Sequence, residues 1–254
     1  MAPINTLEFV YPDWPAPVHV KAVTTTRHGG FSVGPYTSFN LSNRVGDEPG
    51  SVRRNRALLR EVLGLPSNPI WLSQVHGNRV VDAFDAAPGE EADGCITGTP
   101  GVVCAVLTAD CLPILLCDRR STRIGVLHAG WRGLASGIIE EGLRKIQLPT
   151  ANLLAWLGPA IGPSAYEVGD EVRQALVSQD RDLVEAFTPI PDRPGHWLAD
   201  LYDLARRRLR SQGVHEIFGG LRCTLREHEQ FYSHRRDGTS GRMASLIWLE
   251  KSGH

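Results

Sequence analysis

A chain of 254 residues, of which 42% are hydrophobic and 22% charged, can bury a core without staples. Its formal net charge of −1 predicts neither a nucleic-acid nor an anionic-membrane partner. No apolar run approaches the ~18 residues of a membrane span, and the first fifteen residues lack the pattern of a secretory signal. No Gly/Ser-rich or Pro-rich linker divides the sequence, so we expect a single domain over residues 1–254. Five cysteines, four of them between Cys95 and Cys117, indicate reduced thiols in a cytoplasmic protein.

The first part of the chain predicts strands and one helix. Residues 18–30 form an apolar run that ends in a Gly-Gly turn, which is typical of a strand. Residues 51–64 start with Ser, repeat apolar residues at helical spacing and end with Gly, so they predict a helix. Residues 69–77 and 78–84 predict two strands separated by a turn at Gly77–Asn78.

The rest of the chain predicts a mixed sheet. Three runs are continuously apolar, as in central strands covered on both faces: 101–110, 113–118 and 123–130. Beyond them we predict a helix, a buried strand, two more helices and a final strand, at residues 131–146, 152–162, 169–179, 199–213 and 241–250. Because adjacent strands often lack a helix between them, the pattern favours an α+β protein with helices on both faces of a mixed sheet.

Three strand ends carry residues suited to chemistry, namely His76, Cys111 and His128. Ends of neighbouring strands converge in space, and loops there carry function. Two imidazoles and a thiolate suit a borderline-soft metal, and three protein ligands leave a fourth tetrahedral position open for catalysis. A thiol beside histidines also suits nucleophilic catalysis. A small buried Cys and a structural His explain the same residues without any site, and no CxxC or HExxH motif decides between these interpretations.

Blocks along nearly the whole chain resemble, in order, the signature motifs of the YfiH/laccase-domain family. They are "TTTRHGG", "SFNLSNRVGDEPGSVRRNRALL", "WLSQVHGNRV", "ADG", "TADCLPILL", "GVLHAGWRG", "GPAIGPSAYEVG" and "FYSHRRDGTSGRMASLIWL". The resemblance implies a three-layer α/β/α sandwich with a mixed sheet, and a metal triad of His76, Cys111 and His128. The chain departs from the family where Ser164 and Ala165 stand in place of frequent cysteines, which leaves the triad intact.

The resemblance implies two different activities, because family members are described as polyphenol oxidases and as zinc-dependent purine nucleoside enzymes. A His₂Cys set resembles a blue-copper centre, but multicopper oxidases also need a histidine-rich trinuclear cluster. This chain has 9 histidines, and no two of them are separated by a single residue. An oxidase of this sequence therefore needs another mechanism.

We accordingly expect an enzyme that uses Zn²⁺, with Cu²⁺ as the alternative metal. It would cleave adenosine, inosine or guanosine with phosphate to the free base and ribose-1-phosphate, and would deaminate adenosine to inosine. Laccase-like oxidation, metal-free cysteine hydrolysis with Cys111 as nucleophile and His128 as base, and a partner-binding protein with a vestigial site are the alternatives. Nothing in the sequence indicates an obligate protein partner.

Several polar residues are candidates for substrate contacts, and two of them, Arg27 and Arg132, lie at motif glycines. Arg27 and Arg132 could hold phosphate with a fork of donors, and Arg132 lies near the start of a predicted helix, whose dipole favours an anion. Asn40 and Gln74 could hydrogen-bond ribose or base. Asp110 either orients a ligand or caps a neighbouring backbone segment. Further candidates for anion contacts are Arg235 and Arg236.

Overall fold

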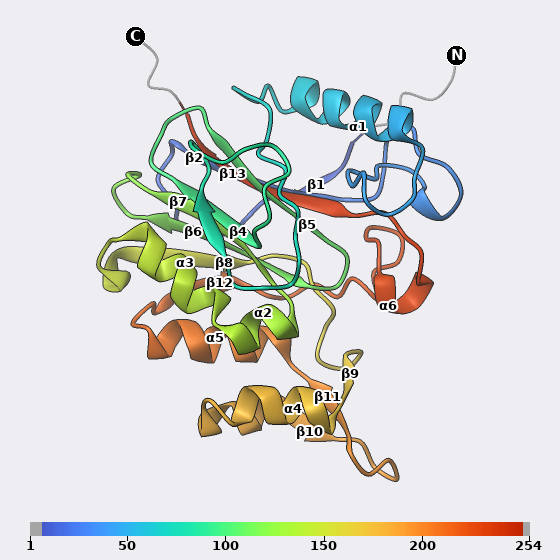
Figure 1. The fold of residues 1–254 in the computed structure, drawn as a ribbon, viewed down its shortest axis with the longest axis vertical. Helices are drawn as coiled ribbons and strands as arrows, with labels where there is room; N and C mark the ends of the chain where they lie inside the picture. Colours follow the sequence, from blue (N-terminus) through green and yellow to red (C-terminus); the bar gives the residue numbers. More distant parts are fainter. Residues whose placement is uncertain (1–6, 251–254) are drawn as a thin grey trace.

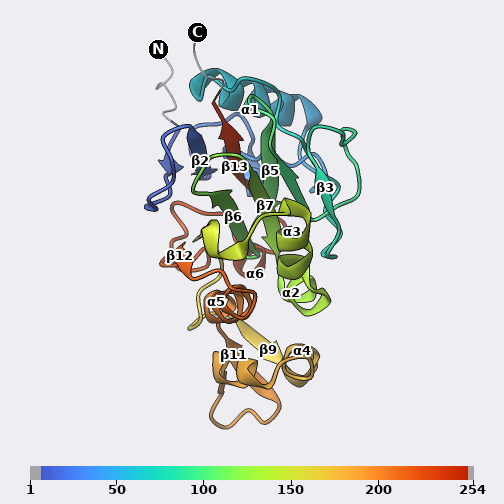
Figure 2. The same cartoon turned by 90° about the vertical axis from the view of Figure 1, so that its left-hand side faces the viewer.

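The computed structural model describes residues 7–250 and contains two β-sheets that pack face to face (Figures 1 and 2). The four-stranded sheet has the order β1 (Phe9–Val10), β2 (Val20–Thr25), β13 (Met243–Leu249) and β5 (Val103–Thr108). The six-stranded sheet has the order β12 (Glu216–Gly219), β8 (Leu153–Leu157), β6 (Leu112–Asp118), β7 (Ile124–Ala129), β4 (Gly94–Thr97) and β3 (Val80–Asp82).

Helices cover the outer face of each sheet. Helix α1 (Pro49–Val62) packs on the four-stranded sheet, and α2 (Trp131–Ser136), α3 (Ile138–Ile146) and α5 (Leu201–Ser211) pack on the six-stranded sheet (Figure 1). At one end, α4 (Asp170–Val177) lies beside a small sheet of β10 (Phe187–Pro189), β11 (His196–Ala199) and β9 (Glu167–Gly169). The short helices are η1 (Gly34–Tyr36), η2 (Thr150–Asn152), η3 (Arg181–Ala186) and α6 (His234–Asp237).

The expected α/β/α sandwich with a mixed sheet is confirmed, and its β layer consists of two sheets. In the six-stranded sheet, β12 with β8 and β3 with β4 are parallel, while the other neighbours are antiparallel. The position of strand β6 between two packed layers explains why its sequence is continuously apolar. Leu116 packs under the helices, whereas Leu115 and Cys117 pack toward the four-stranded sheet, so both faces of the strand are buried.

Two of the predicted elements are wrong. Residues 69–77 are not a strand, because the Gln74 side chain takes the place of a strand neighbour: its Nε2 donates to the Leu107 carbonyl (2.8 Å) and its Oε1 accepts from the Leu107 N–H (2.7 Å). The single helix expected at 131–146 is two helices, α2 and α3, because Gly137 between them has a φ of 88°.

Other boundaries shift for identifiable reasons. Helix α1 begins at Pro49 rather than Ser51, because the Glu48 carboxylate accepts hydrogen bonds from the N–H groups of Gly50 and Ser51. The strand expected at 78–84 is shorter, and strands β4 and β9 to β12 were not predicted, since they are only three or four residues long. Among residues 7–250, no helix has both the length and the apolar character needed to cross a membrane.

Candidate metal centre

The structure brings the three predicted ligands together. One donor atom each from His76, Cys111 and His128 lies within 4.8 Å of the others, and the two imidazole rings meet edge to face at 4.8 Å between centroids. His128 lies in β7, and Cys111 immediately precedes β6. Antiparallel pairing of β6 with β7 sets Pro113 opposite His128, which carries Cys111 to the same end of the sheet.

Backbone shape at this end of the sheet makes room for the thiol. A Cβ on Gly130 would lie 2.8 Å from the Cys111 Sγ, so only glycine leaves the sulfur its place. His76 lies in the turn before β3 with a φ of 61°, a conformation uncommon for residues other than glycine. The turn therefore needs support from elsewhere, and a neighbouring carboxylate provides it.

Asp93, which the sequence did not single out, holds two of the three ligands. It is fully buried, and its carboxylate accepts hydrogen bonds from the N–H groups of Val75 (3.2 Å), His76 (2.9 Å) and Gly77 (2.7 Å). The same carboxylate contacts the Nδ1 of His128 at 2.8 Å, and the Asp93 carbonyl accepts from the His128 N–H at 2.7 Å. Nδ1 is thereby occupied, which leaves Nε2 of His128 as its ligand atom.

The charges of these groups are strongly coupled. Burial alone would raise the pKa of the Cys111 thiol, but hydrogen bonds and charge from His128 and His76 lower it to about 6. Burial alone would lower the pKa of His128, whereas Cys111 and Asp93 raise it to about 9. Burial also opposes the ionisation of Asp93, but His128 and the backbone N–H groups keep its pKa below the usual value. These shifts favour a thiolate at Cys111 paired with an imidazolium at His128.

The donor set fits a divalent transition metal. Two imidazole nitrogens and one thiolate are ligands that zinc and copper both accept, and a metal ion would take the place of the imidazolium proton. The hydrogen bond between His128 Nδ1 and the Asp93 carboxylate matches the arrangement common to metal-binding histidines. A tetrahedral ion held by these three residues would keep one position without a protein ligand, and the same three residues line a pocket.

A pocket of about 510 Å³ opens over the three donors, within the range of small-molecule sites. Four arginines line it, Arg44, Arg132, Arg235 and Arg242, whereas Asp110 is the one carboxylate among its lining residues. A larger hollow of about 810 Å³ runs along α1 and residues 68–71, but none of the three donors lines it. The smaller pocket is therefore the candidate site for small molecules.

The two predicted polar contacts to ribose or base are engaged in the fold. Asn40 is fully buried, and its amide donates to Ser42 and Asp47 while its oxygen accepts from the N–H groups of Ser42 and Arg242. Gln74 does line the pocket, but both ends of its amide bind the backbone of Leu107. A substrate would have to compete with these hydrogen bonds.

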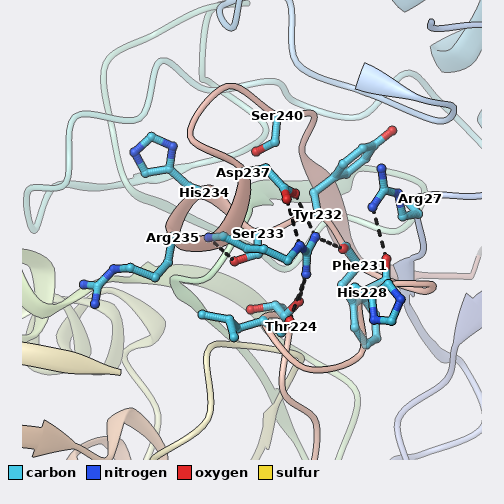
Figure 3. Close-up of polar contacts among 12 residues, drawn as sticks. Arg27, Thr224, His228, Phe231, Tyr232, Ser233, His234, Arg235, Asp237 and Ser240 are labelled. Atoms are coloured by element: carbon cyan, nitrogen blue, oxygen red, sulfur yellow. Dashed lines mark hydrogen bonds and ion pairs between the residues drawn. The ribbon is translucent and has the colours of Figure 1, made fainter. Parts of the chain in front are cut away.

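Two of the predicted anion contacts lie outside the pocket lining. Arg27 donates to the carbonyls of Thr37 and His228 and lies over the Tyr232 ring, as Figure 3 shows in part. Arg236 donates to carbonyls of residues 224, 225 and 231 and pairs with Asp237. Both guanidinium groups serve to hold the segment from Thr224 to Ser240 in place.

The other two predicted anion contacts, Arg132 and Arg235, do line the pocket. Arg132 is exposed and stacks on the Trp131 ring at 4.4 Å, but α2 has only six residues, so the expected contribution of a helix dipole is small. Arg235 extends away from the polar network of Figure 3, donates to the Glu167 carbonyl and lies over the Tyr166 ring. Sequence reasoning missed Arg44 and Arg242, although both lie inside signature blocks of the family resemblance, "SFNLSNRVGDEPG" and "SGRMASLIWL".

Asp110 caps neighbouring backbone, one of the two roles considered for it. Its φ is 90°, and its carboxylate accepts from the Thr224 hydroxyl (2.6 Å) and the Arg235 N–H (2.7 Å). The Asp110 carbonyl also accepts from the N–H of Ile161. The residue thus ties the end of β5 to α6 and to the loop after β8.

Among residues 7–250, His76, Cys111 and His128 form the one group of three or more His, Cys, Asp or Glu side chains placed to hold a metal ion. The described part of the chain therefore offers no counterpart of a trinuclear copper cluster, which agrees with the scarcity of histidines in the sequence.

Comparison with known proteins gives consistent matches over nearly the full length. "Purine nucleoside phosphorylase YfiH" of Escherichia coli (strain K12) is 49% identical over 243 residues, covering 95% of this chain and 99% of that protein. "Purine nucleoside phosphorylase MT2208" of Mycobacterium tuberculosis is 40% identical over 243 residues, covering 92% and 93%.

Solved structures agree. Protein NMB0706 of Neisseria meningitidis superposes with a TM-score of 0.92 at 47% identity, covering 96% of this chain and 99% of that one. YlmD of Geobacillus stearothermophilus gives 0.86 at 33% identity, covering 98% and 99%. A family model described as "Multi-copper polyphenol oxidoreductase laccase" matches residues 21–250, and the chain belongs to this laccase-domain family, which the resemblance of its motifs had indicated.

Proposed function

We propose that the protein is a zinc-dependent purine nucleoside enzyme. It cleaves adenosine, inosine or guanosine with phosphate to the base and ribose-1-phosphate, and it deaminates adenosine to inosine. The observation that carries this proposal is an open set of three metal ligands facing a pocket lined by four arginines. The names of the relatives, purine nucleoside phosphorylases, support the substrate class.

Two groups of residues have different roles, since the three donor residues would hold the metal and the arginines would hold the phosphate. A metal at His76, Cys111 and His128 supplies Lewis-acid chemistry to the group of the substrate or water that faces it. The arginines hold phosphate for attack on the ribose C1′ while the base leaves, and guanidinium groups suit this role because their donors form a planar fork. Asp93 fixes the orientation of the His76 turn and the His128 ring.

The same geometry favours a second candidate, a metal-free cysteine hydrolase. Asp93, His128 and Cys111 stand in the order of a carboxylate, a base and a nucleophile, and the Cys111 pKa of about 6 provides a thiolate at neutral pH. Elemental analysis of the fully active protein distinguishes the two candidates, because the hydrolase would be active without metal and the proposed enzyme would not.

We further propose that the protein works in the cytoplasm on small molecules and needs no obligate protein partner. The reduced state of all five cysteines fits this location.

Product analysis tests the proposed function directly. Purified, metal-analysed protein is incubated with adenosine, inosine and guanosine, with and without phosphate, and the products are identified by chromatography. We expect ribose-1-phosphate only with phosphate, and inosine with ammonia from adenosine in either case. Oxygen consumption with a phenol by the copper-loaded protein, without nucleoside turnover, would instead establish an oxidase.

Substitution of the ligands should remove the metal without unfolding the chain. Cys111→Ser exchanges a soft thiolate for a hard, protonated oxygen, and His128→Ala leaves two ligands, so each variant should lose most of its zinc. Cys117→Ser, at a buried cysteine that faces the other sheet, is the matched control and should keep about one zinc per chain. Elemental analysis and circular dichroism measure both properties. Full zinc retention in Cys111→Ser with activity abolished would make Cys111 a nucleophile.

Asp93→Asn tests the positioning of the ligands. The amide has one acceptor atom for donors that now share two carboxylate oxygens, so we expect zinc affinity to fall about 10–100-fold. Asp118→Asn is the control, because this buried carboxylate accepts from the N–H groups of Arg120, Thr122 and Arg123 in the turn at the far end of β6. Competition with a chelator measures the zinc affinity, which should be unchanged in the Asp118→Asn variant. Equal affinity of the Asp93→Asn variant and the wild type would contradict the proposed role.

Arg132→Ala should affect the two reactions differently. Loss of a charge-assisted phosphate contact should cost about 1.5 kcal/mol, roughly tenfold in phosphorolysis, and should leave deamination nearly unchanged. We take the low end of the range for a charge-assisted hydrogen bond, because among residues 7–250 only the stacking on Trp131 fixes this exposed guanidinium. Steady-state rates for both reactions give the comparison, and equal losses would assign Arg132 a structural role.

A further inference from the structure

Arg242 occupies an unusual place among the arginines of the pocket. It directly precedes β13, where Met243 pairs with Thr108 of β5, so Arg242 stands next to the end of β5 that leads to Cys111. Its Nη1 donates to the carbonyls of Ser240 (2.8 Å) and Gly241 (2.9 Å), which fixes the guanidinium against its own loop. Arg242 is thus held more firmly than Arg132.

Among residues 7–250, the guanidinium of Arg242 makes no direct ion pair, although the charges of Cys111 and Asp110 act on it from nearby. Its Nε and Nη2 make no hydrogen bond within the described part of the chain. Nε and Nη2 are not among the buried atoms that lack a hydrogen-bond partner, so both nitrogens are accessible. Because Arg242 lines the pocket, this edge of its guanidinium is available to a ligand. Burial lowers the pKa of Arg242, against the charges of Cys111 and Asp110, so the fold bears a desolvation cost for a charge that an anion would offset.

Thr108 supplies a second, independent observation. Its side chain is 1% exposed and lines the same pocket, yet its hydroxyl has no hydrogen-bond partner among the described residues. Buried hydroxyls are almost always satisfied in native proteins, and an orphan costs about 1–3 kcal/mol. The hydroxyls of buried threonines on other strands do have partners, for example Thr24 in β2 with Ser245 and Thr97 in β4 with the Thr99 N–H.

We propose that Arg242 and Thr108 form a subsite for a phosphoryl group, with the open edge of the guanidinium and the threonine hydroxyl as donors to its oxygens. Because the hydroxyl of Thr108 is buried and unbonded, a rotation about χ1 would be needed to bring it to the bound oxygen. The subsite rests on the proposed function, in which inorganic phosphate is the second substrate. The phosphate group of a nucleotide presents the same oxygens, so both sources are included in the test.

Calorimetry with the zinc-loaded protein measures the affinity for inorganic phosphate and, separately, for AMP. Arg242→Met keeps the apolar stem and should weaken phosphate binding at least about tenfold, while Arg242→Lys, which keeps the charge, should restore part of it. Thr108→Val is isosteric and should weaken binding about 3–10-fold. Zinc content should stay at the wild-type level in all three variants.

A matched control separates ligand binding from structure. Thr97→Val removes a buried hydroxyl that has a partner, so it should lower the free energy of unfolding and leave phosphate affinity unchanged. Thr108→Val should do the reverse, since removal of an orphan hydroxyl leaves the ligand-free stability unchanged or higher. Reduced ligand-free stability of Thr108→Val with wild-type phosphate affinity would show that a water satisfies the hydroxyl and would overturn its part in the subsite.

The outcomes also distinguish the subsite from the proposed function. Phosphate or AMP binding that is lost in Arg242→Met, without nucleoside turnover by the wild type, supports the subsite and overturns the function. Nucleoside phosphorolysis with wild-type phosphate affinity in both Arg242→Met and Arg242→Lys overturns the subsite and supports the function. Tighter binding of AMP than of phosphate, lost in the same variants, supports the subsite and makes the phosphoryl group part of the nucleotide.

Discussion

The candidate site depends on one buried carboxylate. Asp93 accepts hydrogen bonds from three successive backbone N–H groups around His76 and from the Nδ1 of His128. A charge with no exposed surface is stable only with such a set of donors, and the same donors fix the geometry of two ligands that lie 52 residues apart in the chain. Because the turn at His76 has a positive φ, its shape and the position of its imidazole both follow from Asp93.

The two-sheet architecture explains why the third ligand arrives at the same place. Strand β6 lies between β7 and β8 and is buried on both faces, so the chain just before it has little freedom to move. Cys111 occupies that position, and Gly130 at the end of β7 gives its sulfur room. Asp110 fastens the same turn to Thr224 and Arg235, so the segment that carries Arg235 is set relative to Cys111. The three candidate metal ligands and the arginines of the pocket are thereby parts of one framework.

The sequence was sufficient to predict the central strands and the convergence of His76, Cys111 and His128, because long apolar runs indicate buried strands and their ends meet. It was not sufficient for Asp93, whose partners come from a turn and a strand that only the folded chain brings together. Asn40 and Gln74 have a structural role that the sequence did not indicate. Their amides make hydrogen bonds to the backbone in this fold. Which backbone N–H and C=O groups need a side-chain partner cannot be told from the sequence until the strand pairing is known.

Charge balance favours an anionic substrate over a phenol. Four guanidinium groups line the pocket, and the lining residues that oppose them are Asp110, whose oxygens already accept two hydrogen bonds, and the Cys111 thiolate. A divalent ion at the three donors would make the pocket more positive still. Neutral phenols offer nothing to compensate such a concentration of positive charge, whereas phosphate oxygens do. The four arginines of the pocket therefore support, beyond the scarcity of histidines, the proposal that this member of the laccase-domain family binds phosphate.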